Sequence, residues 1–179
     1  MASSSDTTSI YFWNSDDTWQ AFLSQWYPCT FTDSDQITYR STEMYMMYKK
    51  ATFFSDDETA QKILGAKTPR KQKALGRQVK NFDSERWNGV REQVVEDGNY
   101  LKFTQAGDVT GKHTLKELLL STGSQKLVEA SPHDRLWGIG FSADVAPNTP
   151  RDQWGQNLLG RTLMRVRKRL QEEFGGPSV

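Results

Sequence analysis

The sequence has little of the residue types that build disulfide frameworks and metal centres. Its 179 residues include one cysteine, Cys29, and two histidines, His113 and His133. One cysteine excludes an intramolecular disulfide and a metal site made of several cysteines, and this usage is typical of a reducing compartment. Two histidines are also too few for a histidine-rich metal site, so such a site is not expected. We therefore expect a function that needs no metal ligands from the protein.

The sequence also lacks long apolar runs and a strong excess of charge of one sign. No apolar stretch approaches the ~20 residues that a transmembrane helix needs, and the opening MASSSDTTS lacks the charged-then-apolar pattern of a signal peptide. The net charge is +1, so bulk charge alone does not indicate a nucleic-acid partner. These absences predict an intracellular protein of the cytoplasm or the nucleus, with no membrane partner.

The patterning that is present is that of a helix-rich globular protein. Its length favours one domain over 9–174, with flexible ends at 1–8 and 175–179. The predicted fold class is α+β, a predominantly α-helical single domain with a few short strands. Strands are predicted at 9–13, 27–31, 36–39, 126–130 and 136–141, the second and third forming a β-hairpin, and helices at 43–54, 57–64, 69–79, 85–105, 112–120 and 157–174.

The segment STEMYMMYKK at 41–50 places opposite charges within an apolar helix. Glu43 and Lys50 are seven residues apart, or ~20° on a helical wheel, so they share one face of a helix that Thr42 is expected to cap. The two charges could flank a small ligand. Alternatively, Glu43 is a first-turn carboxylate favoured by the helix dipole, and Lys50 extends to solvent. Lys49 lies off this face and is expected to face solvent.

Two glycine-containing segments are further candidates for binding. The segment HDRLWGIG contains Asp134, Trp137 and Gly138, which could bond to a sugar hydroxyl, stack on a base and allow close approach of a ligand. In WGQNLLG, Asn157 can cap the last helix, where free N–H groups next to Gly160 would suit a phosphate. The alternatives are a turn followed by a core strand, and a simple capped helix.

Two basic runs stand out from the near-neutral total charge. Such runs are usually solvated faces, but they can also form an electrostatic footprint for phosphates. The cations are Lys62, Lys67, Arg70, Lys71, Lys73, Arg77 and Lys80 in the first run, and Arg161, Arg165, Arg167, Lys168 and Arg169 in the second.

Four motifs, in this order, resemble the NADAR family of YbiA-like N-glycosidases. They are TEMYMMYKKA at 42–51, ALGRQVKNFDSERWNGVRE at 74–92, LKELLLSTGSQKLVEASPHDRLWGIG at 115–140 and WGQNLLGRTLMRVRKRL at 154–170. The resemblance covers roughly residues 9–174. It implies a helical fold with a few short strands, and hydrolysis of an N-glycosidic bond to a ribose phosphate without a cofactor.

The resemblance also implies roles for individual residues. A carboxylate beside the anomeric carbon can stabilise the positive charge of the transition state, and an amine can serve as a Schiff-base nucleophile or as electrostatic support. The catalytic residues implied are Glu43, Lys50 and Asp134. The substrate-binding residues are Trp87 and Trp137 for a base, Arg40, Arg77 and the helix start at Asn157 for phosphates, and Gly138 and Gly160.

Three functions stay open from the sequence. The first is removal of ADP-ribose from guanine bases of DNA or RNA, in which case the basic runs contribute to binding. The second is hydrolysis of a ribosylamino-pyrimidine phosphate of riboflavin biosynthesis, for which the basic runs are irrelevant. The third is a non-catalytic module that binds ADP-ribose or NAD. A carboxylate at the position of Glu43 weighs against the third, because it serves chemistry more than binding. Of the two hydrolases we favour the first, because the chain has two basic runs.

Overall fold

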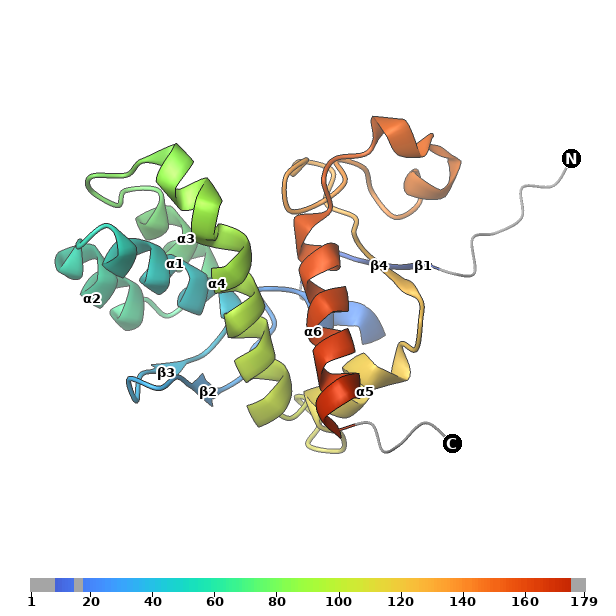
Figure 1. Ribbon diagram of the computed structural model, residues 1–179, viewed down its shortest axis with the longest axis horizontal. Coiled ribbons are helices and arrows are strands. Elements are labelled where there is room, and N and C mark those ends of the chain that lie inside the picture. The colour runs from blue at the N-terminus through green and yellow to red at the C-terminus, as the bar shows by residue number, and fades with distance from the viewer. Residues whose placement is uncertain (1–8, 15–17, 175–179) are drawn as a thin grey trace, which may run out of the picture. The chain divides into compact units, whose positions relative to one another are not determined.

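The computed structural model describes residues 9–14 and 18–174 (Figure 1). The flexible ends predicted at 1–8 and 175–179 lie outside the described residues. The described chain divides into two compact units. One unit consists of the residues up to Ser24 together with those from Glu117 onward, and the other is Gln25–Lys116. Within the described ranges, no helix combines the length and the apolar character that a bilayer crossing requires.

The unit Gln25–Lys116 is a group of helices joined to a small hairpin. Its central helix, α1, packs against the other three helices of the unit (Figure 1). This arrangement buries α1 on several sides and confirms the helix-rich class predicted from the sequence. The elements are β2 (Phe31–Thr32), β3 (Thr38–Tyr39), α1 (Thr42–Phe53), α2 (Asp57–Gly65), α3 (Pro69–Gly76) and α4 (Ser84–Gln105).

Helix α1 begins at a serine cap. The Oγ of Ser41 accepts a hydrogen bond from the N–H of Met44 at 3.1 Å, which satisfies one of the free donors of the first turn. The prediction of Thr42 as the cap is therefore wrong by one residue. The hydroxyl of Thr42 instead donates to the carbonyl of Gln25 at 3.2 Å, which fixes the preceding chain to the start of the helix.

Two helices differ in extent from their predictions. Helix α3 ends at Gly76, three residues earlier than predicted, and α5 (Leu115–Ser121) begins three residues later. The late start of α5 follows from a turn before it, in which the N–H of Asp108 donates to the carbonyl of His113 at 2.9 Å. These main-chain groups are therefore not available to extend the helix.

The predicted hairpin is present, but its strands are shorter, and the first begins at Phe31, where the strand predicted at 27–31 ends. Phe31 pairs with Tyr39 and Thr32 with Thr38 in antiparallel register. Figure 1 shows the hairpin beside the C-terminal half of α4. There Gln105 bonds to the main chain of Thr32 in both directions, at 2.9 and 3.0 Å. The hairpin is therefore fixed to α4 through a two-way amide contact.

The other unit is built on a parallel pair of strands. Strand β1 (Ser9–Phe12) pairs with β4 (Lys126–Glu129), and α6 (Leu158–Phe174) packs on β4. The helix stands beside β4 in Figure 1. Both strands agree closely with the predictions. Short 3-10 turns complete the unit at Trp19–Leu23, Ala146–Asn148 and Arg151–Gln153.

The strand predicted at 136–141 is wrong. Its carbonyl groups accept hydrogen bonds from the chain that leads into α6, including Gly155 N–H to Ile139 and Asn157 N–H to Gly138, at 2.8 and 3.1 Å. A single bond, from the N–H of Ile139 to the carbonyl of Glu129 at 3.0 Å, joins the segment to the end of β4, which is too little to continue the strand pairing. A Cβ at Gly138 would lie 2.8 Å from the carbonyl oxygen of Glu129, so only glycine fits this approach.

Candidate active site

Glu43 is a buried carboxylate in the first turn of α1. Its residue is 5 % exposed, and its N–H donates to the carbonyl of Gln25 at 3.0 Å. The residues around it on the helix are buried too, including Met46 and Met47. Burying a carboxylate costs free energy, which the positive end of the helix dipole only partly offsets. Such a group is a candidate for chemistry.

Lys50 lies two turns further along α1 and is half-buried. Its ammonium donates to the carbonyl oxygen of Gly76 at 2.8 Å and lies 4.2 Å from the ring centroid of Phe82. Burial, and secondarily the charge of Arg77, lowers the pKa of Lys50 from its ordinary value. The lowered pKa increases the fraction of neutral amine, the form that acts as a nucleophile. The alternative in which Lys50 simply extends to solvent is therefore wrong.

Lys49 is not a solvent-facing residue, contrary to the prediction. Its ammonium lies 2.8 Å from Oδ2 of Asp33, whose residue is only 6 % exposed. The same carboxylate oxygen accepts a hydrogen bond from the hydroxyl of Tyr39 at 2.8 Å. Lys49 therefore ties the hairpin to α1, while its neighbour Lys50 is directed to α3.

The two arginines proposed as phosphate ligands have different surroundings. The guanidinium of Arg40 donates to the carbonyls of Leu64 and Ala66, at 3.1 and 2.9 Å. Arg40 thereby satisfies carbonyl groups at the end of α2, which is a structural role. Arg77 is exposed at the end of α3, and its charge acts on Lys50. Of the two, Arg77 is better placed to meet an anion.

Trp87 lies in a group of aromatic side chains near the start of α4. Its residue is 6 % exposed, and its ring centroid lies 6.2 Å from that of Phe53. This burial gives Trp87 a packing role, and its predicted contact with a base is untested. The exposed ring of the group is Phe82, which sequence reasoning missed. The signal in the sequence is an aromatic residue directly after the first basic run.

The remaining predicted residues belong to the other unit, where Asp134 forms a turn. Its Oδ1 accepts hydrogen bonds from the N–H groups of Leu136 and Trp137, both at 2.8 Å. These two hydrogen bonds agree with the interpretation of HDRLWGIG as beginning with a turn, and they give the carboxylate of Asp134 a structural role. Trp137 itself is half-buried.

The prediction of free N–H groups at the start of α6 is wrong. The N–H groups of Leu158 and Leu159 donate to main-chain carbonyls at 3.2 and 3.1 Å. The side chain of Asn157 does not cap the helix but bonds to β4, donating to the carbonyl of Leu127 and accepting from the N–H of Glu129, both at 2.9 Å. Gly160 is a packing residue, because a Cβ there would clash with the Leu127 carbonyl oxygen.

Sequence reasoning also missed a buried cation in α4. Lys102 is 0 % exposed, and its ammonium lies 5.5 Å from the ring centroid of Tyr27 and 5.1 Å from that of Phe103. Burial lowers the pKa of Lys102 to about 8, opposed by the nearby Cys29. Nothing in the sequence distinguishes this lysine from an exposed one, since burial of α4 depends on tertiary packing.

Comparison with known proteins places the chain in a family. The NADAR domain matches residues 11–171. N-glycosidase R617 of Acanthamoeba polyphaga mimivirus is 41% identical over 155 residues, which cover 84% of this chain and 88% of the relative. Riboflavin biosynthesis protein VVA0006 of Vibrio vulnificus (strain YJ016) is 32% identical over 163 residues, covering 91% of this chain but 39% of that protein.

The fold is similar to a solved structure of the same kind. The NMR structure of the E. coli protein YbiA matches with a TM-score of 0.74 and 26% identity, covering 96% of this chain and 90% of the other. The chain therefore belongs to the NADAR family and is an N-glycosyl hydrolase. This confirms the family resemblance and the enzyme class predicted from the sequence.

Proposed function

We propose that this N-glycosyl hydrolase removes ADP-ribose from guanine bases of nucleic acid. The observation that carries the proposal is the pair of ionisable residues on α1. Glu43 is a buried carboxylate, and Lys50 is a half-buried amine of lowered pKa. A buried carboxylate and an amine of lowered pKa on one helix are characteristic of sites that do acid–base or nucleophilic chemistry.

Glu43 would act at the sugar. Breaking the N-glycosidic bond develops positive charge on the anomeric carbon, and an adjacent carboxylate stabilises that charge. Removal from water strengthens the interaction, because the buried carboxylate is 5 % exposed and poorly screened. Asp134 is not proposed as a second catalytic carboxylate, since one of its oxygens already accepts hydrogen bonds from two N–H groups of its turn.

Lys50 would act once the sugar ring opens. The bond from the ring oxygen to the anomeric carbon breaks, and the proton of the base N–H passes by way of the Glu43 carboxylate to the ring oxygen, leaving an imine between the anomeric carbon and the base nitrogen. The neutral amine of Lys50 adds to the carbon. Its two N–H protons then pass through Glu43 to the base nitrogen, which leaves as a neutral amine while the lysine imine forms. Water then hydrolyses the lysine imine, which releases ADP-ribose and restores the amine. The lowered pKa of Lys50 supports this route, because only the neutral amine can add.

The surroundings of Lys50 support an anionic substrate with aromatic groups. Arg77 is exposed and close enough to influence the ionisation of Lys50, so it can meet a phosphate. Phe82 presents a ring that is 46% exposed beside the same amine. Trp137 is half-buried, and its contact with a base stays a proposal.

A second candidate substrate is a ribosylamino-pyrimidine phosphate. The observation that favours it is the relative named Riboflavin biosynthesis protein, although the aligned region is 39% of that protein. The same two residues would serve both substrates, since both have a ribose phosphate joined to a base amine. The basic residues of α3 favour the larger, more anionic substrate.

One experiment separates these substrates. The protein is incubated with an oligonucleotide bearing ADP-ribosyl guanine and, separately, with the riboflavin intermediate, and the released ribose phosphate is measured. We expect release from the oligonucleotide, and loss of that release in Glu43→Gln. Borohydride added during turnover is expected to attach the sugar to Lys50. Binding of both substrates without release from either would contradict the proposal and favour a binding module.

A further inference from the structure

The cations of the first basic run are unusually free of acidic neighbours. The sequence contains no Asp or Glu between Glu58 and Asp83, although the whole chain has a net charge of +1. Two of the seven cations are paired and share one carboxylate, because Lys62 and Lys80 lie 2.6 and 2.7 Å from the two oxygens of Glu58. Among the described residues, no ion pair forms to the other five, which are Lys67, Arg70, Lys71, Lys73 and Arg77.

Three of these cations form one face of α3. At ~100° per residue, Arg70, Lys73 and Arg77 fall within ~60° of one another. Of the three buried residues of the helix, Gln72 and Leu75 lie on the opposite side, and Gly76 lies between the two sides. Arg70 and Arg77 are exposed and Lys73 is half-buried. The face therefore presents a row of positive charge to solvent along the length of the helix.

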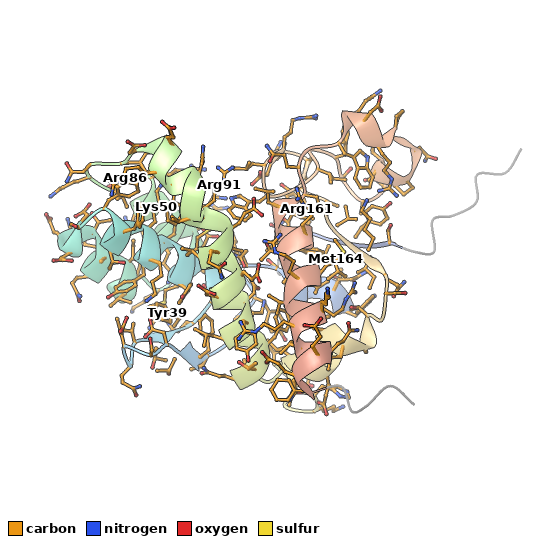
Figure 2. The ribbon with its side chains drawn as sticks, viewed as in Figure 1. Tyr39, Lys50, Arg86, Arg91, Arg161 and Met164 are labelled. Carbon is orange, nitrogen blue, oxygen red and sulfur yellow. The ribbon has the colours of Figure 1, made fainter. Side chains whose placement is uncertain are left out.

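The row ends beside an exposed aromatic ring. Phe82 is 46% exposed, lies edge-on to Phe54 at 5.4 Å, and has the ammonium of Lys50 at 4.2 Å from its centroid. Arg86 adds a further cation next to the same cluster, 5.5 Å from the ring of Phe54. Lys50 and Arg86 can be followed in Figure 2, at the same end of this unit. Cations and an accessible ring therefore meet at the proposed catalytic amine.

We propose that Arg70, Lys73, Arg77 and Phe82, here called the α3 strand site, bind a single strand of nucleic acid. The cations contact successive phosphates, and one unpaired base stacks on Phe82. A positively charged track combined with an aromatic platform is how proteins hold single strands without reading sequence. A duplex offers the phosphates but keeps its bases stacked, so Phe82 selects against it. The inference rests on the proposed function, because it names the carrier of the ADP-ribosylated base.

The second basic run does not offer a comparable surface. Arg167 is buried and donates to the hydroxyl of Thr122 at 2.7 Å. Arg169 pairs with Glu173 at 2.8 Å, and Lys168 lies 3.8 Å from Glu172. Two of the five cations of this run are therefore ion-paired, and a third is buried. The phosphate-binding surface is therefore assigned to α3. The ion-paired lysines can serve as a matched control.

The test is binding of unmodified, fluorescently labelled 12-nucleotide DNA and RNA strands, measured by anisotropy over a range of salt concentrations. We expect affinity to fall as salt rises, and a blunt duplex of the same length to bind more weakly. Arg70→Gln/Lys73→Gln should reduce the slope of log affinity against log salt by about 1.4, the value for two lost phosphate contacts on a single strand. Lys62→Gln/Lys168→Gln removes the same charge from paired cations and should leave the slope unchanged.

The aromatic contribution is measured with substitutions that keep packing. Phe82→Leu should weaken single-strand binding by about 5- to 150-fold, the effect of losing one stacked base, while Phe82→Trp should retain it. Thermal melting checks that each variant is folded. Equal losses in the α3 and control double variants, or duplex binding as tight as single-strand binding, would overturn the proposal. Because the strands carry no ADP-ribose, this result is independent of whether the chain hydrolyses that substrate.

Discussion

The ammonium of Lys50 donates a hydrogen bond to the main-chain carbonyl oxygen of Gly76 over 2.8 Å, which joins α1 to the end of α3. The contact depends on a small residue, because a Cβ at Gly76 would clash with the side chain of Met47. It also places the amine next to Arg77, the residue after Gly76. The pKa of Lys50 therefore depends on the position at which α3 ends, because that position sets the distance to Arg77.

The first prediction concerns the pH dependence of hydrolysis. Since burial and the charge of Arg77 lower the pKa of Lys50, the neutral amine becomes available at a lower pH than for an ordinary lysine. We expect kcat to rise with pH through this pKa. Arg77→Gln removes the repelling charge, so the pKa of Lys50 rises and the kcat profile moves to higher pH.

Lys80→Gln is the matched control for Arg77→Gln. It removes the same charge from a side chain that is paired with Glu58 at 2.7 Å. Rates are measured from pH 6 to 10 with saturating substrate, so that changes in KM do not enter. Equal shifts in the two variants would contradict a specific effect of Arg77 on Lys50.

The second prediction concerns the ion pair that holds the hairpin to α1. Burial opposes ionisation of Asp33, but hydrogen bonds from Lys49, Tyr39 and the N–H of Ile37 outweigh it and hold the pKa of Asp33 below its ordinary value. The group thus contributes stability above pH 3.8 that is lost as the pH falls through its lowered pKa. Asp33→Asn should lower the free energy of unfolding at pH 7 by about 1 to 3 kcal/mol, the value of hydrogen bonds to a charged group.

The measurement is urea denaturation followed by tryptophan fluorescence. Asp35→Asn serves as the control, because Asp35 is exposed and lies further from Lys49, at 3.4 Å. An exposed pair contributes little, so this variant should be close to the wild type. If Asp33→Asn is as stable as Asp35→Asn, the buried contact does not stabilise the hairpin.

The sequence predicts the features that depend on local patterns. The helix that contains Glu43 and Lys50 follows from its apolar periodicity. That these two residues lie on one face of the helix follows from the wheel. These inferences succeed because each depends on neighbours within one or two helical turns.

Features that depend on distant partners could not be predicted. Asn157 matches a helix cap by its position, but its side chain bonds to Leu127 and Glu129, about thirty residues earlier in the chain. Lys49 and Lys50 are identical in type and adjacent, yet one bonds to the hairpin and the other to α3. Choosing between such partners requires the tertiary fold, because local composition is the same for each alternative.

The third prediction uses the buried lysine of α4. Because the pKa of Lys102 is lowered to about 8, the folded protein loses a proton there that the unfolded chain keeps until its pKa of 10.5. The unfolded state therefore binds more protons between these values, and stability gains a contribution that rises with pH, up to about 3 kcal/mol. Lys102→Met should remove this contribution.

The quantity compared is the difference in unfolding free energy between the variant and the wild type at each pH. The difference cancels the opposing effect of Tyr27, whose pKa is raised by burial. Cys29 does not cancel in this way, because the charge of Lys102 lowers the pKa of that thiol and is lost in the variant. Lys67→Met, at an exposed position, is the control and should give a difference that is constant with pH. A constant difference for Lys102→Met as well would show that this lysine ionises normally.

The fourth prediction concerns the packing of α6 on β4. Gly160 is buried, and a Cβ there would clash with the carbonyl oxygen of Leu127 and lie 2.6 Å from the side-chain amide of Asn157. The carbonyl belongs to a paired strand and the amide is bonded to that strand, so neither can move aside easily. Gly160→Ala should therefore destabilise the fold by about 3 kcal/mol, at the upper end for overpacking.

Alanine at Gly89 is expected to change the free energy of unfolding in the opposite direction. Gly89 is exposed within α4 and has no atom within 4 Å of an added Cβ, so alanine there should stabilise the protein by about 0.5 to 1 kcal/mol through helix propensity. Both variants are compared by urea denaturation. Since each adds one methyl group to a helix, the difference between them isolates the close approach of α6 to β4. Gly160→Ala unfolding at the same urea concentration as Gly89→Ala would contradict that approach.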